Sequence, residues 1–170
     1  TDPHIMYPSG NTNTRAAAMV SQINATYPLP AFIVNAGDMA EAGLRREYDI
    51  YRSIVSTFNP SIALYEGSPG NHDVARGMGH LYYRERIGSV HTVWTKDDYF
   101  FMVLNEGMLN HSDGHFSRTE MDWIRNRLEN SIAKQGKSVI CFWHHPSDSV
   151  ANNSAGEGSM LDNGQMVLEL

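Results

Sequence analysis

Three short apolar runs in this chain each lead directly into a cluster of polar and glycine residues. The runs cover residues 31–34, 62–65 and 138–143, and they are followed by Asp38, Gly70-Asn71-His72-Asp73 and His144-His145-Pro146. Short uninterrupted apolar runs are typical of strands that are buried on both faces. In open α/β sheets, ligands bind outside the carboxyl ends of the strands. The pattern therefore predicts an α/β fold whose functional site lies at one edge of a sheet.

Amphipathic stretches separate the apolar runs. Their periodicity predicts helices over residues 15–24, 44–58 and 81–86, and a further helix that opens at the capping box Ser117-Arg-Thr-Glu120. Residues 90–94 and 99–105 flank a polar turn and indicate a β-hairpin. A loop is expected over residues 147–164, and the start of a helix over 165–170. No internal repeat or linker interrupts the chain, so residues 1–170 are expected to form a single domain.

The composition excludes several classes of function. A chain of 170 residues that is 41% hydrophobic suits one globular domain. A net charge of -6, with no cluster of lysine and arginine, disfavours binding to nucleic acid. No apolar run approaches the length of a membrane span, and no signal-peptide pattern is present. The cytoplasm is thus slightly favoured, but a cleaved signal would leave no trace, so the localisation and the oligomeric state stay open.

The polar clusters contain oxygen and imidazole donors without any thiolate. Such donors suit manganese, zinc or iron better than a soft metal. A carboxylate such as Asp38 can bridge two cations in sites that catalyse displacement at phosphorus. The opening residues Asp2 and His4 would join this site only if a strand carried them to the same edge, since polar residues at a terminus are usually solvated.

Four motifs in order resemble those of the calcineurin-like metallophosphoesterase family. They are Asp2-Pro-His4, Gly37-Asp38-Met-Ala-Glu-Ala-Gly43, Gly70-Asn71-His72-Asp73 and His144-His145-Pro146. The resemblance implies a layered α/β/β/α sandwich of mixed sheets flanked by helices. It also implies a metal-dependent phosphoric ester hydrolase, either a phosphodiesterase or a phosphatase, that acts on a small phosphoester with a dinuclear metal centre and a metal-bound hydroxide nucleophile. Within the family, the motifs are closest to the cyclic-nucleotide and glycerophosphodiester phosphodiesterase branch.

The resemblance also implies a role for each motif residue. Asp2, His4 and Asp38 would hold one divalent metal ion, and Asp38, Asn71 and His144 the second. His72 would contact the scissile phosphate and protonate the leaving oxygen, oriented by Glu41 or Asp73. His145 and Arg76 would help to shape the substrate cleft. Three of these residues have simpler alternatives: Glu41 as a solvated loop residue, Asp73 as part of a turn, and His145 as a packed histidine.

The family's G-H-x-H motif is absent from these 170 residues, although its two histidines complete both metals in the family. We therefore expect the domain to be incomplete at both ends, with an apolar strand before Thr1 and a G-H-x-H soon after Leu170. The alternative function is a non-catalytic binding scaffold with the same fold. Such a scaffold should have lost ligands within its motifs, whereas the four motifs here are intact.

Overall fold

The computed structural model of the chain describes residues 1–76, 78–129 and 135–147. Its helices are α1 (Asn11–Asn24), α2 (Arg45–Val55), α3 (Asn71–Val74), α4 (His80–Arg86) and α5 (Arg118–Arg127). Its strands are β1 (Phe32–Val34), β2 (Ala63–Tyr65), β3 (Thr92–Lys96), β4 (Tyr99–Val103) and β5 (Ser138–Phe142). Apart from Ser147, the expected loop over 147–164 and the expected helix over 165–170 lie outside the described residues.

The strands form two small sheets. β1 and β2 pair in parallel, with Phe32 opposite Ala63 and Val34 opposite Tyr65. In the second sheet β4 lies in the centre, antiparallel to β3 and parallel to β5. The hairpin and the three apolar runs are therefore strands, as the sequence predicts, and the α/β class is confirmed.

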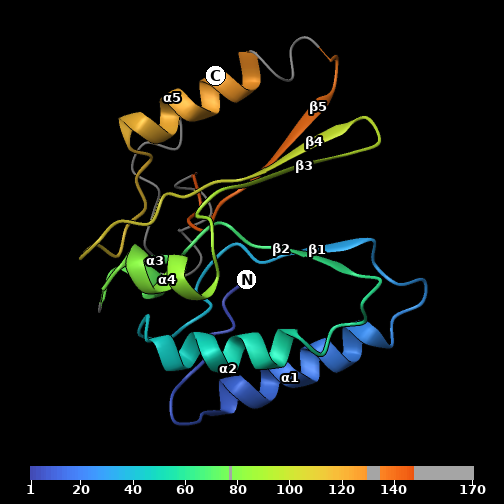
Figure 1. Ribbon diagram of the computed structural model, residues 1–170, viewed down its shortest axis with the longest axis vertical. Helices are drawn as coiled ribbons and strands as arrows, with labels where there is room; N and C mark the ends of the chain where they lie inside the picture. The colour runs from blue at the N-terminus through green and yellow to red at the C-terminus, as the bar shows by residue number, and fades with distance from the viewer. Residues whose placement is uncertain (77, 130–134, 148–170) are drawn as a thin grey trace.

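The two sheets face each other through aromatic side chains. The ring of Tyr65 stacks on Trp94 at 3.8 Å between centroids, and the ring of Phe32 contacts Trp94 and Phe101 edge-on. Figure 1 shows α1 and α2 on the outer side of β1 and β2, and α5 on the outer side of β3, β4 and β5. The described residues thus form four layers, with helices outside and sheets inside.

Each outer helix buries one apolar face. Tyr48 and Tyr51 of α2 are buried in one core cluster, together with Ile5, and Met121 and Ile124 of α5 are buried in the other. The Ser117 side chain caps α5 by accepting a hydrogen bond from the amide of Glu120 at 3.2 Å. The Glu120 carboxylate, however, bonds His91, so only half of the predicted capping box forms among the described residues.

Several elements differ from the predicted ones, and α2, for example, ends at Val55 instead of residue 58. α1 begins at Asn11, four residues before the predicted start, because Gly10 is its N-cap and the polar first turn carries no apolar periodicity. The strands of the hairpin extend to a two-residue turn in which Asp97 has a φ of 51°. The short helix α3 was not predicted, since four residues show no period. No helix among the described residues is long and apolar enough to cross a membrane.

Candidate metal centre

Main-chain hydrogen bonds place the N-terminal residues beside the segment that follows β1. The amides of Asp2 and His4 donate to the carbonyls of Gly37 and Asp38 at 3.1 and 3.0 Å, and Ile5 forms a parallel bridge with Ala40. Pairing of residues 2–5 with residues 37–41 is therefore enough to bring Asp2 and His4 to Asp38. This is the edge at which the sequence analysis expected them.

Three of the predicted ligands have a strained backbone. Asp2, His4 and Asp38 have φ angles of 58°, 44° and 51°, in the left-handed region that non-glycine residues rarely adopt. Such conformations cost about 1–3 kcal/mol each and persist where the surroundings hold them. Their coincidence on three predicted ligands supports a functional role for this cluster.

Asp38 lies at the centre of two groups of potential ligand atoms. One group contains Asp38, His4 and His72, and the other contains Asp38, Asp2 and His144. Within each group the ligand atoms lie within 4.8 Å of one another. Oδ2 of Asp38 is 3.5 Å from Nε2 of His4 and 3.4 Å from Nε2 of His144. Asp38 is common to both groups, and Asp2 falls in the group of His144, although its Oδ1 is also 4.0 Å from Nε2 of His4.

The two imidazoles nearest Asp38 are each oriented through the nitrogen that faces away from it. Nδ1 of His4 bonds Oε2 of Glu41 at 2.9 Å, and Nδ1 of His144 bonds the carbonyl of Ala36 at 3.1 Å. Metal-binding histidines are usually held in this way, with one nitrogen on a carboxylate or carbonyl and the other free for the metal. The donor set therefore fits a divalent cation at each group.

Charges in the cluster shift the pKa of two of its members. Burial acts to raise the pKa of Asp38, but a hydrogen bond from His144, that residue's charge and the His72 amide lower it overall. Burial acts to lower the pKa of His144, but the Asp38 and Asp2 carboxylates and Glu106 raise it to about 9. The carboxylates of Asp38 and Asp2 thus favour the protonated form of His144.

Glu41 lies closer to His4 than to His72. Its carboxylate is 2.9 Å from Nδ1 of His4 and 3.6 Å from Nδ1 of His72. The hydrogen bond of His72 goes to the main-chain carbonyl of Glu41 at 2.7 Å, and the ring packs edge-on against His4. The Glu41 side chain, which is 34% exposed, is therefore paired with His4, and the hydrogen bond to His72 comes from the Glu41 backbone.

Asp73 does not orient His72 but joins two motif loops. Its fully buried carboxylate accepts hydrogen bonds from the amides of Met39, Ala40 and Gly70 at 3.2, 3.0 and 3.0 Å. Burial raises the pKa of Asp73 to about 6, although these amides act to lower it. The role of Asp73 is thus to hold the backbone on which Asp38 and Asn71 stand.

Asn71 is the first residue of α3, and its loop approaches Asp38 closely. The amide of His72 donates to Oδ1 of Asp38 at 2.9 Å. A Cβ atom at Gly70 would lie 2.1 Å from that oxygen, so only glycine allows this contact. The backbone of the G-N-H-D motif is therefore in direct contact with the Asp38 carboxylate of the G-D motif.

His145, which the resemblance offered for the substrate cleft, is buried in the structure. His145 is only 3% exposed, and its ring nitrogens bond Oε2 of Glu106 at 2.8 Å and the carbonyl of Ser112 at 2.9 Å. Both nitrogens are thus used inside the protein, as in the alternative of a packed histidine. Arg76 is exposed after α3, and its guanidinium makes no ion pair among the residues that the structure describes.

Sequence analysis missed Glu106, which bonds the backbone on which His144 stands. Its carboxylate accepts hydrogen bonds from the amides of His144 and His145 at 3.0 and 2.8 Å. Glu106 follows the apolar run of β4 in the same way that Asp38 follows β1. The rule that polar residues gather at strand ends could therefore have found it.

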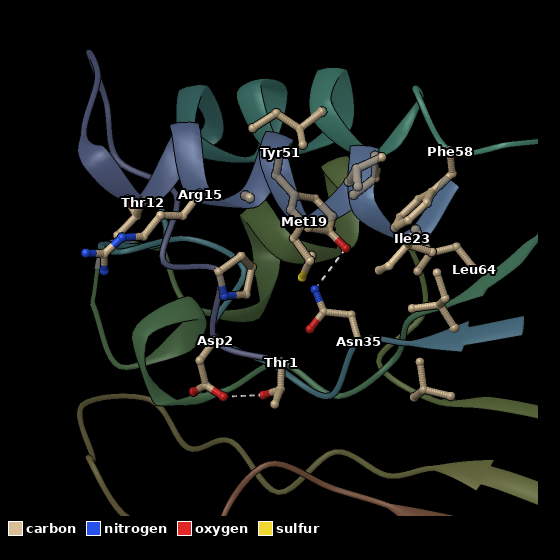
Figure 2. Close-up of a pocket in the computed structure, with 17 residues that line it drawn as sticks. Thr1, Asp2, Thr12, Arg15, Met19, Ile23, Asn35, Tyr51, Phe58 and Leu64 are labelled. Carbon is tan, nitrogen blue, oxygen red and sulfur yellow. Dashed lines mark hydrogen bonds between the residues drawn. The ribbon is translucent and has the colours of Figure 1, made fainter. Parts of the chain in front are cut away.

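A separate cavity of about 350 Å³ lies behind the cluster, between α1, α2 and the first sheet. Figure 2 shows Asp2 and Thr1 on one side of it and the hydrogen bond between Asn35 and Tyr51 on another. Its other walls are mainly apolar, with Met19, Ile23 and Leu64 among them. The cavity is not the metal cluster, because neither His4 nor His144 lines it.

No family model matches the chain. Among curated proteins, it is 24% identical to a glycerophosphodiester phosphodiesterase from Enterobacter lignolyticus, over 98% of this chain and 60% of that protein. It is 27% identical to a probable cyclic nucleotide phosphodiesterase from Rhodopseudomonas palustris, over 78% of this chain and 48% of the relative. A 3',5'-cyclic-nucleotide phosphodiesterase from Nostoc is 25% identical over 91% of this chain and 55% of its own length.

The chain thus spans about half to three fifths of the length of these relatives. Their names match the branch that the motifs indicate. The three relatives confirm the resemblance of this chain to phosphodiesterases of the metallophosphoesterase family.

Proposed function

We propose that this chain carries the metal-binding part of a phosphodiesterase that uses two divalent cations. The observation that carries the proposal is the position of Asp38, whose Oδ2 lies within 3.5 Å of imidazoles from two distant parts of the chain. The alignment with three phosphodiesterases over most of the chain supports the reaction class. Their names also suggest the substrate class, a small cyclic or glycerol phosphodiester.

Asp38 would bridge the cations, with His4 and Asp2 on one side, as the resemblance implies, and Asn71 and His144 on the other. Oδ1 of Asp2 lies 4.0 Å from Nε2 of His4 and 3.8 Å from Nε2 of His144, so its position allows either side. Manganese, zinc or iron(II) would suit these oxygen and imidazole donors. When bound, two such cations supply neutralisation of the phosphoryl oxygens and a hydroxide nucleophile. The main-chain hydrogen bonds that hold Asp2 and His4 against Gly37 and Asp38 would keep these ligands in place before a cation arrives.

His72 would serve the leaving group. Its ring lies beside His4, and the Glu41 carbonyl at 2.7 Å from Nδ1 directs the other nitrogen away from the backbone. A proton on that nitrogen could pass to the leaving oxygen. Arg76, which has no ion-pair partner in the described part of the chain, would contact the phosphate. We also propose that residues 1–170 belong to one domain with the calcineurin-like layered sandwich.

The metal content and the hydrolysis of bis-p-nitrophenyl phosphate test this function. We expect full-length protein purified with manganese to contain about two metal ions per chain and to lose activity on chelation. Activity should return when manganese is added back. A full-length protein that binds no metal and hydrolyses no phosphodiester would refute the proposal and favour a binding scaffold.

The role of His72 is tested separately with a series of leaving groups. His72→Ala should keep its metal, and its turnover should fall most for substrates whose alcohol is a poor leaving group. His4→Ala is the matched control, since it should lose metal and its turnover should therefore fall with every substrate. Loss of metal from His72→Ala would instead make His72 a ligand, as its place beside His4 and Asp38 allows.

A further inference from the structure

Glu106 is a buried carboxylate that the proposed chemistry does not use. It follows β4 and is only 1% exposed. Its Oε1 accepts hydrogen bonds from the amides of His144 and His145, and its Oε2 bonds Nδ1 of His145. A buried charge is tolerated only with such a set of partners. These side-chain bonds all go to His144 and His145, just beyond the end of β5.

A loop closes over this arrangement from the other side. The carbonyl of Ser112 bonds Nε2 of His145 at 2.9 Å, and the amide of His115 donates to the carbonyl of Glu106 at 2.7 Å. A Cβ atom at Gly114 would lie 2.3 Å from Oε2 of Glu106, so glycine is required for the loop to approach. Glu106 thus joins the end of β4, residues 112–115 and the end of β5.

The same contacts determine where His144 lies. Its amide is held by Glu106, its Nδ1 is held by the carbonyl of Ala36, and its Nε2 reaches Asp38 at 3.4 Å. Outer partners of this kind typically change metal affinity by about 10- to 100-fold when they are mutated. We propose that Glu106 is a positioning residue that sets the place of His144 in the metal centre, an inference that rests on the proposed function.

Two substitutions separate geometry from charge at this position. In Glu106→Gln the amide oxygen can keep both main-chain bonds, and its NH₂ group can donate to Nδ1 of His145 while Nε2–H donates to Ser112. In Glu106→Asp the charge remains, but the shorter side chain cannot reach all three partners. A positioning role therefore predicts that the neutral variant behaves like the wild type and the charged one does not.

The test measures binding of Mn²⁺ by calorimetry and the visible absorption spectrum of the Co²⁺-loaded full-length protein. We expect Glu106→Asp to lose about tenfold or more in Mn²⁺ affinity and to show a shifted Co²⁺ spectrum. Glu106→Gln should match the wild type in both. Wild-type affinity in Glu106→Asp would overturn the proposal. A loss of about tenfold or more in the Mn²⁺ affinity of Glu106→Gln would also overturn it. This outcome remains measurable if Glu106→Asp does not fold.

Glu66→Asp is the matched control for general destabilisation. Glu66 is another largely buried carboxylate, and it is not one of the proposed ligands. It accepts a hydrogen bond from the hydroxyl of Tyr51 at 2.5 Å. This change should lower the melting temperature without changing Mn²⁺ affinity. A loss of affinity here equal to that of Glu106→Asp would overturn the positioning role. A wild-type protein that binds no Mn²⁺ would overturn the proposed function together with this inference.

Discussion

Asp73 and Glu106 are buried carboxylates that hold ligand-bearing backbone in the two halves of the molecule. Asp73 belongs to the half built on β1 and β2, where it accepts hydrogen bonds from three main-chain amides. Glu106 belongs to the half built on β3, β4 and β5, where it accepts two amides and pairs with the ring of His145.

The difference between them lies in how replaceable the charge is. The partners of Asp73 are all donors that cannot change, so both of its oxygens must accept. The imidazole partner of Glu106 can act as donor or acceptor, depending on its tautomer. We infer that the first half needs a carboxylate at Asp73, whereas the second half needs only the shape of Glu106.

The largest expected effect is at Asp38, which belongs to both groups of potential ligands in the described part of the chain. Asp38→Ala removes a ligand from both groups, so turnover should fall by more than about a hundredfold, the scale of one well-placed electrostatic group. Asp2→Ala removes a ligand from one group only and should retain one metal ion. Metal analysis and turnover of the two variants make the comparison. Equal metal loss in both would show that Asp38 does not bridge the halves.

The next effect distinguishes the two buried carboxylates directly. Asp73→Asn would place an NH₂ group against a main-chain amide, leaving a buried donor unsatisfied at a cost of about 1–3 kcal/mol in the free energy of unfolding. Glu106→Gln should leave that free energy close to the wild-type value. Urea denaturation of the metal-free proteins measures both. If the two amides cost the same, the contrast between the halves does not hold.

A smaller effect is expected at Glu41. Because its carboxylate bonds His4 rather than His72, Glu41→Gln should weaken metal binding by about tenfold, as for other partners of metal-binding histidines. The dependence of turnover on the leaving group should stay unchanged. Titration with Mn²⁺ and a series of phosphodiesters check the two parts. A defect confined to poor leaving groups would restore the pairing of Glu41 with His72 that the sequence suggested.

The smallest expected effect is the release of a proton from His144 when a cation binds. The folded, metal-free chain raises the pKa of His144 to about 9, above its ordinary value of 6.5, so this residue is protonated at pH 7.5. A cation must displace that proton, and its apparent affinity should therefore rise with pH until about 9. The lowered pKa of Asp38 means that this carboxylate has no proton to release.

Calorimetry at pH 7.5 in buffers of different ionisation enthalpy should detect about one proton released from His144. His144→Ala should abolish this release. Proton release that persists in the variant would show that another group titrates on binding. By the same linkage, the ion pair of His144 stabilises the metal-free fold fully below pH 6.5, and this contribution is lost as the pH rises through about 9.

Much of the site was predictable because its polar residues follow the ends of the predicted strands. Asp38, His72 and His144 each follow an apolar run, and the period of those runs is visible without any structure. The boundaries of α1 and the short helix α3 were not predictable, because polar first turns and four-residue helices carry no period. The environment of His145 was not predictable either, since its partners Glu106 and Ser112 lie 39 and 33 residues away.

By itself, the sequence determined the α/β class, the strands and the donor types that gather at their ends, because these depend on local period and composition. Only the tertiary structure decided which donors meet. It grouped Asp2 with His144, turned the Glu41 carboxylate toward His4 and buried His145 against Glu106. Such pairings depend on how loops from two facing sheets pack. The close approach of Gly70 to Asp38 and the left-handed backbone of Asp38 leave no signal in a local sequence pattern.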